Sequence, residues 1–195
     1  MTVRLVVTLA LGVAGLPPYT AAQLPTVLIE TSLGAIVVEI DTVQAPITGG
    51  NFLRYVDHGL YDGGRFYRTV TLQNQPENDV RIEVIQGGID PARRDDRFDA
   101  IPLERTNVTG RRHLDGTISV ARAGPDTGGS EFFICIGDQP SLDFGGARNS
   151  DGQGFAAFGQ VVDGMEVIRA IHKSPTQGER LTPAVMIRAA SQAGR

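Results

Sequence analysis

The chain has 195 residues, 41% of them hydrophobic and 21% charged, which suits one sizeable globular domain and argues against both two domains and disorder. A formal net charge of −4 leaves no basic excess to neutralise phosphates, which argues against nucleic acid as a partner. The single cysteine, Cys135, excludes an intramolecular disulfide, a cysteine-cluster metal site and a Cys-x-x-Cys redox pair.

The first 22 residues have the order of a secretory signal peptide. Residues 1–4 are a short basic start, residues 5–16 are apolar or small, and two prolines and the small residues at 20–22 follow. The apolar run is shorter than the roughly 20 residues that a membrane-spanning helix needs. We therefore expect cleavage near Ala22, a mature domain over residues 23–195, no stable membrane insertion afterwards, and a periplasmic or secreted protein. The alternative is an uncleaved anchor or a frayed first helix.

Short strands dominate residues 23–99. The elements predicted here, in chain order, are strands at 26–31 and 35–41, a helix at 46–58, and strands at 65–70 and 81–86. The helix is predicted because Pro46 suits a first helical turn, apolar residues follow at helical spacing, and Gly59 suits a C-terminal cap. Residues 71–80 and the charged run 90–99 are predicted as loops.

The remaining residues repeat this pattern of short elements and turns. They predict strands at 117–121, 131–136, 155–162 and 184–187, a helix at 164–172, and glycine-rich loops at 122–130 and 143–154. About eight strands and two helices without βαβ alternation predict a mainly β fold, a closed eight-stranded antiparallel barrel capped by two α-helices.

Most familiar catalytic signatures are absent from the sequence. There is no phosphate-binding loop, dinucleotide fingerprint, Gly-x-Ser-x-Gly elbow or His-Glu-x-x-His motif. His58, His113 and His172 are scattered and favour surface or structural roles over metal ligation. Cys135 lies within an apolar strand, where a thiol usually packs rather than reacts. We expect neither a metal nor another cofactor.

Five short motifs carry the functional signal. They are Phe66-Tyr67-Arg68, residues 84–88 (VIQGG), 119–125 (SVARAGP) and 129–134 (GSEFFI), and Phe158-Gly159. With them the chain resembles the cyclophilins, a family of peptidyl-prolyl cis–trans isomerases, over nearly the whole predicted domain. The resemblance implies a cofactor-free, monomeric enzyme that accelerates rotation about X-Pro bonds in proline-containing polypeptides and so assists their folding.

The resemblance also implies a site. Arg68 corresponds to the family's catalytic arginine, Gln86 to the glutamine that holds substrate backbone, and Phe133 to a wall of the proline pocket. The implied substrate-binding residues are Gln86, Val84, Phe133, Leu142, Ala121, Arg122, Ala123, Glu131 and Phe155. Of these, residues 121–123 would pair through their backbone with the substrate residues before proline.

Several positions depart from the family pattern. Glu83 stands where the family has an aromatic pocket wall, Glu131 for a glutamine, Phe155 for a histidine and Ser141 for the rim tryptophan. Residues 71–81 form a longer link beside the site. Because Ser141 offers neither an indole N–H nor a large apolar face, we expect weak binding of cyclosporin.

Strand alternation suggests a partner for the catalytic arginine. Phe66 and Arg68 are two apart on one predicted strand, and Glu131 and Phe133 two apart on another, so each pair should share a face. If Arg68 and Phe133 both line the pocket, Glu131 should point there and pair with the guanidinium.

Two other functions stay open on the sequence alone. A proline-peptide-binding scaffold or chaperone that has lost turnover would account for Glu83 and the altered rim. A structural barrel without a ligand would leave Arg68, Gln86 and Phe133 unexplained.

Overall fold

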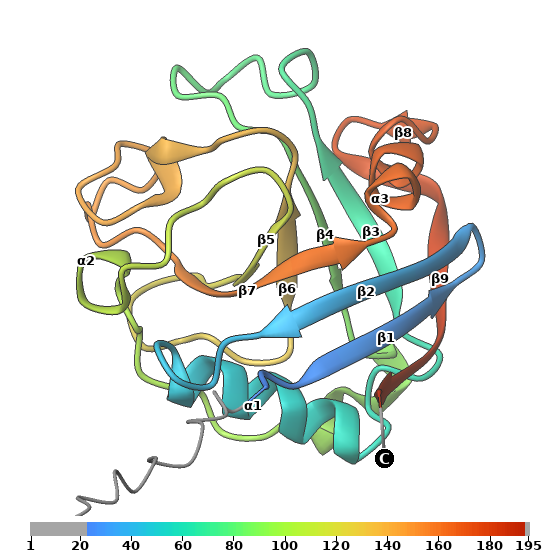
Figure 1. The fold of residues 1–195 in the computed structure, drawn as a ribbon. Helices are drawn as coiled ribbons and strands as arrows, with labels where there is room; N and C mark the ends of the chain where they lie inside the picture. Colours follow the sequence, from blue (N-terminus) through green and yellow to red (C-terminus); the bar gives the residue numbers. More distant parts are fainter. Residues whose placement is uncertain (1–22, 194–195) are drawn as a thin grey trace, which may run out of the picture.

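The computed structural model describes residues 23–193, so the predicted signal peptide at 1–22 lies outside the described residues (Figure 1). The strands are β1 (Thr26–Thr31), β2 (Gly34–Ile40), β3 (Arg65–Val70), β4 (Val84–Gly88), β5 (Thr117–Val120), β6 (Phe132–Cys135), β7 (Ala156–Asp163), β8 (Thr176–Gln177) and β9 (Arg180–Gln192). The helices are α1 (Pro46–Asp57), α2 (Thr106–Thr109) and α3 (Met165–His172), with 3₁₀ helices at Pro91–Asp96 and Pro140–Leu142. In this range no helix has the length and apolar character needed to cross a membrane.

The sheet closes on itself, as predicted. Neighbouring strands follow the order β1-β2-β7-β5-β6-β4-β3-β9, and β9 also pairs with β1, which completes an antiparallel barrel of eight strands. Helix α1 lies across one open end of the barrel and α3 across the other (Figure 1). Closure leaves no exposed edge among these eight strands, so the fold needs no further cover there.

The last strand is much longer than the predicted 184–187. β9 runs from Arg180 to Gln192 because its first half pairs with β3 and β8 and its second half pairs with β1. These partners lie far away in sequence, so the local pattern around Pro183 did not indicate the full strand. The two-residue strand β8 and the four-residue helix α2 were likewise not predicted.

The strand predicted at 81–86 begins only at Val84. The backbone of Ile82 is held instead by a loop side chain, because Gln75 Nε2 donates to the Ile82 carbonyl at 2.6 Å. The predicted loop at 71–80 therefore has a packed anchor, and Gln75 is only 2% exposed.

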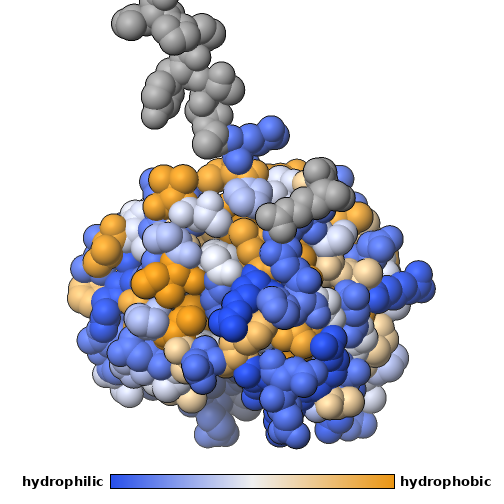
Figure 2. All heavy atoms as spheres, turned by 90° about the horizontal axis from the view of Figure 1, so that it is seen from below, coloured by the Kyte–Doolittle hydropathy of each residue, from blue (hydrophilic) through white to orange (hydrophobic). Residues whose placement is uncertain are grey.

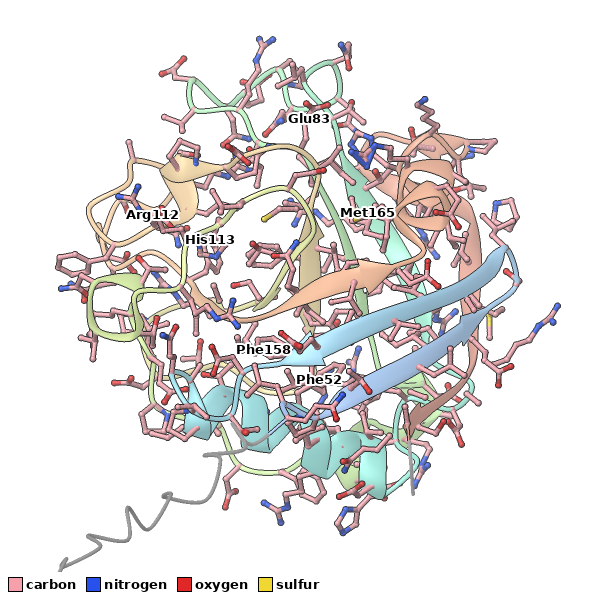
Figure 3. The ribbon with its side chains drawn as sticks, viewed as in Figure 1. Phe52, Glu83, Arg112, His113, Phe158 and Met165 are labelled. Carbon is pink, nitrogen blue, oxygen red and sulfur yellow. The ribbon has the colours of Figure 1, made fainter. Side chains whose placement is uncertain are left out.

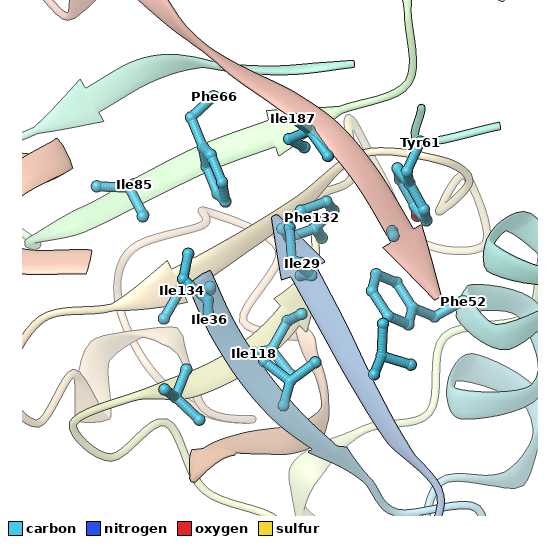
Figure 4. Close-up of a cluster of buried hydrophobic side chains, with 14 of the residues drawn as sticks. Ile29, Ile36, Phe52, Tyr61, Phe66, Ile85, Ile118, Phe132, Ile134 and Ile187 are labelled. Atoms are coloured by element: carbon cyan, nitrogen blue, oxygen red, sulfur yellow. The ribbon is translucent and has the colours of Figure 1, made fainter. Parts of the chain in front are cut away.

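An aromatic cluster fills the α1 end of the barrel. Phe52 of α1 lies 5.2 Å from Phe158 of β7, 5.5 Å from Phe132 of β6 and 5.1 Å from Tyr61, measured between ring centroids (Figures 3 and 4). Isoleucines from six strands fill the rest of the interior, and the labelled ones are Ile29, Ile36, Ile85, Ile118, Ile134 and Ile187. Helix α1 is thus fixed to the barrel by its own buried aromatic side chain.

The opposite faces of β4 and β6 form a second, smaller cluster outside the barrel. Along β6, Phe132 and Ile134 point into the barrel, whereas Phe133 and Cys135 point outward. The outer cluster consists of Val70, Ile82, Val84, Phe133, Cys135 and Leu142, with Ala121 and Phe155 packed against it. Because both faces of β6 are covered, this strand is a continuous apolar run in the sequence (FFIC).

A β-bulge in β3 overturns one expectation from strand alternation. The register shifts between Phe66 and Arg68, so Tyr67 is an extra residue opposite the neighbouring strands. Phe66 therefore packs in the barrel interior, whereas Arg68 lies on the outer face. The prediction that Phe66 and Arg68 share a face was wrong, because alternation holds only where the strand carries no bulge.

The surface at the α1 end is mixed. Hydrophobic side chains occur there in small groups that hydrophilic residues separate (Figure 2). Ile47 of α1 is 44% exposed and Val43, just before the helix, 73% exposed. Isolated apolar residues of this kind are ordinary for a globular protein.

Candidate functional site

A slot of about 230 Å³ opens over the outer cluster, between β3, β4, β6 and the loop after β6. Its lining residues are Arg68, Ile82, Val84, Gln86, Ala121, Arg122, Phe133, Leu142, Arg148, Asn149 and Phe155. The floor is apolar and the rim carries arginine and amide side chains. This composition suits a small apolar group attached to a polar chain.

The slot brings together most of the residues that the sequence predicted. Arg68, Gln86, Val84, Phe133, Leu142, Ala121, Arg122 and Phe155 all line it. Ala123 and Glu131 lie outside the slot, in an adjoining hollow of about 410 Å³ that shares Gln86, Ala121 and Arg122 with it. The two spaces together form one continuous path along residues 121–123.

The Arg68 guanidinium is held by two neighbours. Its Nε and Nη2 both donate to Glu179 Oε2, at 2.8 and 2.7 Å, and its Nη1 donates to Gln86 Oε1 at 2.7 Å. A guanidinium has five N–H groups, so one on each terminal nitrogen stays available to a ligand. The side chain is 33% exposed, which leaves it reachable from the slot.

Glu131 does not contact Arg68 directly, so the predicted ion pair was wrong. Glu131 instead accepts hydrogen bonds from the Tyr67 hydroxyl at 2.7 Å and from Arg97 Nη2 at 3.0 Å. The reason is the bulge, which places Tyr67 between the two residues. Glu179 of the β8–β9 turn takes the expected position beside the guanidinium.

A chain of hydrogen bonds nevertheless links Glu131 to Arg68. Arg68 donates to Gln86 Oε1, Gln86 Nε2 donates to the Tyr67 oxygen at 2.6 Å, and the Tyr67 hydroxyl donates to Glu131. Burial, together with the neighbouring carboxylate, raises the pKa of Tyr67 well above its usual value, so the hydroxyl remains a donor. The donor directions are consistent along the whole chain, which fixes the orientation of the Gln86 amide.

His113 supports the floor of the slot from behind. Its ring is fully buried and stacks on Phe133 with the ring centroids 5.8 Å apart (Figure 3). Nδ1 lies 2.7 Å from Asp143 Oδ1 and Nε2 lies 3.0 Å from Ser119 Oγ. His113 is therefore a structural residue, as the sequence favoured, although it acts directly beneath the candidate site.

Glu83, one of the departures from the family pattern, does not face the slot. It lines a separate surface hollow and lies 3.9 Å from His172 Nε2. Ile82 lines the slot in its place. An apolar wall is thus kept, but the neighbouring residue supplies it.

Arg148 is a site residue that the sequence did not reveal. It reaches the slot from the glycine-rich loop 143–154 and donates through Nη1 to Val80 O at 2.7 Å and Gln75 Oε1 at 3.0 Å. Burial and the positive charge of Arg68 lower the pKa of Arg148. One arginine therefore joins the two long loops at the rim, and only the folded chain brings its partners together.

A second arginine anchors the same loop. Arg122 Nε donates to Gly154 O at 2.7 Å, and its two terminal nitrogens donate to the Asp151 carboxylate at 2.7 and 2.9 Å. The hydrogen bonds from Arg122, together with the Gln153 N–H, lower the pKa of Asp151 to about 2. The Arg122 side chain is thus engaged within the protein, and its backbone is the part that faces the path along residues 121–123.

Glu179 and Arg148 had no local signal in the sequence. Glu179 lies 111 residues from Arg68, and Arg148 lies 73 residues from Gln75. A charged residue in a polar turn has the same local sequence pattern whether or not a distant partner contacts it.

Within residues 23–193, no group of three or more His, Cys, Asp or Glu side chains is placed to hold a metal ion.

Comparisons with known proteins agree with one another. Residues 26–192 match the family model "Cyclophilin type peptidyl-prolyl cis-trans isomerase/CLD". The chain is 34% identical over 173 residues to peptidyl-prolyl cis-trans isomerase A of Dickeya dadantii, covering 88% of this chain and 84% of that protein. It is 32% identical over 156 residues to peptidyl-prolyl cis-trans isomerase cyp18 of Streptomyces antibioticus, covering 80% and 87%.

Solved structures show the same fold. A crystal structure of a cyclophilin type peptidyl-prolyl cis-trans isomerase from Cryptosporidium parvum superposes with a TM-score of 0.70 at 22% identity, covering 88% of this chain and 99% of that one. A second crystal structure of that protein, in the presence of the dipeptide Ala-Pro, gives a TM-score of 0.69.

We predict that Asp143 makes the fold sensitive to acid. Burial alone would raise its pKa, but hydrogen bonds from the His113 ring and backbone N–H outweigh burial and lower it. A lowered pKa stabilises the fold above the usual aspartate value of 3.8, and this contribution is lost as the pH falls below it. Urea unfolding of wild type should therefore show a larger loss of stability between about pH 5 and pH 3 than the Asp143→Asn variant. Equal losses in both proteins would contradict this.

Proposed function

The chain belongs to the cyclophilin-type peptidyl-prolyl cis-trans isomerase family, and on this premise we propose that it isomerises proline-containing polypeptides in the slot, with Arg68 as the catalytic residue. The observation that carries the proposal is a guanidinium with two free N–H groups at the mouth of an apolar slot. The chain is a peptidyl-prolyl cis–trans isomerase by its relatives, and the site residues are our assignment.

The chemistry needs an arginine and no nucleophile. Amide resonance stiffens the prolyl C–N bond and gives a rotation barrier of about 18–20 kcal/mol. Uncatalysed exchange takes roughly 10–100 s, and reaching milliseconds requires the barrier to fall by roughly 6 kcal/mol. In the twisted state the nitrogen regains its lone pair and accepts a hydrogen bond, which the planar amide cannot do well. A fixed N–H donor beside that nitrogen therefore binds the twisted state more tightly than the planar one.

The neighbours of Arg68 hold that donor in place. Glu179 occupies the Nε edge of the guanidinium and Gln86 takes one hydrogen of Nη1, so the plane of the group is set before substrate arrives. Pre-set donors lose little free energy to reorganisation when the transition state forms. Glu131 contributes at a distance, because it closes the hydrogen-bond chain that orients Gln86.

The remaining residues hold the substrate on either side of the rotating bond. Val84, Phe133 and Leu142 provide apolar walls for the proline ring. In this proposal the second N–H of the Gln86 amide and the backbone of residues 121–123 bind the residues before proline. One end of the substrate is thus fixed by backbone contacts while the ring is held in the slot, which leaves the bond between them free to turn.

A binding scaffold without turnover is the weaker candidate. Its support in the sequence was Glu83 as a lost pocket wall together with the altered rim, and Glu83 lines a hollow outside the slot. The slot retains an apolar lining through Ile82, and Arg68, Gln86 and Phe133 meet in it. These contacts support a competent catalytic site.

We further propose that the protein is exported and acts as a folding catalyst in the periplasm or outside the cell, as a monomer. The support is the order of charged, apolar and small residues within positions 1–22. Clients would then be polypeptides that fold after export.

We predict that the Arg68→Ala variant loses at least about 10²-fold in kcat/KM on a short Xaa-Pro peptide, equivalent to roughly 2.7 kcal/mol. Arg68→Lys should recover little, because an ammonium lacks the planar fork that Glu179 and Gln86 hold. Glu179→Gln should cost less than about tenfold, since its amide oxygen still accepts a hydrogen bond. Arg169→Ala, which removes an exposed arginine that pairs with Asp115, is the matched control and should leave turnover unchanged. Full activity in a folded Arg68→Ala protein would refute the catalytic assignment.

We predict weak inhibition by cyclosporin. Ser141 cannot supply a rim indole, and the loss of an aromatic contact and a hydrogen bond removes several kcal/mol, or a few decades of affinity. Turnover of a peptide substrate in the presence of the drug measures this directly. Ser141→Trp should lower the inhibition constant, whereas Ser141→Ala should not. Nanomolar inhibition of the wild-type protein would contradict the prediction.

We predict that the mature protein begins near Gln23. Expression of the full chain, cell fractionation and N-terminal sequencing test this, and replacement of Leu11 by Arg in the apolar run should retain the protein in the cytoplasm. Recovery of wild-type protein in the cytoplasm with residues 1–4 intact would defeat the proposal.

A further inference from the structure

A groove larger than the slot lies on the other side of Arg68. It has a volume of about 1080 Å³ and is formed by β3, the 3₁₀ helix Pro91–Asp96, and the β8–β9 hairpin. Arg68 and Glu179 line it, so it adjoins the guanidinium that also faces the slot. Tyr67, Arg97 and Glu131 border it as well, which connects it to the hydrogen-bond chain behind Gln86.

The charge of this groove is opposite to that of the whole chain. Five arginines and two glutamates line it, an excess of three positive charges, whereas the chain carries a formal net charge of −4. The arginines are Arg65, Arg68, Arg94, Arg97 and Arg180, and the glutamates are Glu131 and Glu179. We call this surface the arginine groove.

Both carboxylates in the groove are already engaged. Glu179 pairs with Arg68 at 2.7 Å, and Glu131 pairs with Arg97 at 3.0 Å. Among the described residues, the side chains of Arg65, Arg94 and Arg180 have no hydrogen bond or ion pair with protein groups. Arg65 is half-buried as a residue, and its side chain has no anionic partner.

Two arginines of the groove are cross-strand neighbours in the sheet. Arg180 of β9 stands directly opposite Arg68 of β3 in the sheet register. Like charges directly across a strand pair are destabilising. Arg65, Arg94 and Arg180 thus leave three guanidinium groups without an acidic partner around one hollow beside Arg68, which suits an anionic ligand.

A peptide carboxylate suits this groove. The lining mixes the three free guanidinium groups with apolar side chains, including Ile89, Leu181 and Pro183. Planar guanidinium groups bind carboxylates through paired, charge-assisted hydrogen bonds, and the apolar floor suits the stem of a side chain. The groove also shares Arg68 with the slot, and Arg97 and Glu131 with the hollow beside it.

We propose that the arginine groove is an accessory subsite that binds Asp or Glu side chains of the client polypeptide near its proline, and so selects acidic clients. This inference rests on the proposed function, because it takes the client to be held at Arg68. Arg65, Arg94 and Arg180 act as specificity-determining residues and make no contact with the rotating bond.

The test compares kcat/KM for matched Xaa-Pro peptides. One peptide has only neutral residues, and the others carry two glutamates placed either before or after the proline. At least one acidic peptide should be favoured by about fivefold at low ionic strength, and the preference should shrink as salt is added. The double variant Arg65→Gln/Arg94→Gln should bring the acidic-to-neutral ratio close to one. Arg188→Gln, which removes an exposed arginine of β9 outside the groove, is the matched control and should leave the ratio unchanged.

The outcomes separate this proposal from the one on which it rests. Turnover of the neutral peptide with an acidic-to-neutral ratio near one in wild type would overturn the subsite and leave the isomerase intact. A preference that survives in the double variant would equally overturn it. No turnover of any peptide by folded wild-type protein would instead refute the proposed function.

Discussion

Strands β4 and β6 are buried on both faces, and both the barrel core and the slot depend on this burial. Phe132 and Ile134 fill the barrel on one face, while Phe133 and Val84 form the outer cluster on the other. Since alternate residues of a strand point to opposite faces, a single short segment serves both the core and the slot. The floor of the slot is therefore built on the same strands as the barrel core, and His113 and Asp143 support it from behind.

One irregularity in this regular frame creates the polar half of the site. The bulge at Tyr67 turns Arg68 outward beside Gln86 and places the Tyr67 hydroxyl between Gln86 and Glu131. Without the extra residue, Arg68 would share the face of Phe66 and point into an apolar interior. The β-bulge thus redirects the Arg68 side chain and brings its positive charge to the edge of the slot.

The departures from the family pattern are compensated from elsewhere in the chain. Ile82 provides the wall that Glu83 does not. Glu179 provides the carboxylate beside Arg68 that strand alternation assigned to Glu131. Arg148 joins the two long loops at the rim. Each replacement comes from a loop or hairpin that lies against the sheet, so the scaffold is kept while the edge of the site changes.

Local periodicity in the sequence predicts the barrel and both capping helices, and the family resemblance that the motifs carry implies eight of the residues that line the slot. The sequence did not determine which groups hold Arg68. Glu179, Arg148 and the arginine groove arise from contacts between residues far apart in the chain, and the bulge in β3 breaks the alternation on which local inference relies. Spacing fixes the direction of a side chain only while pairing is regular, whereas the partners of a charged residue depend on which strands and loops the fold brings together.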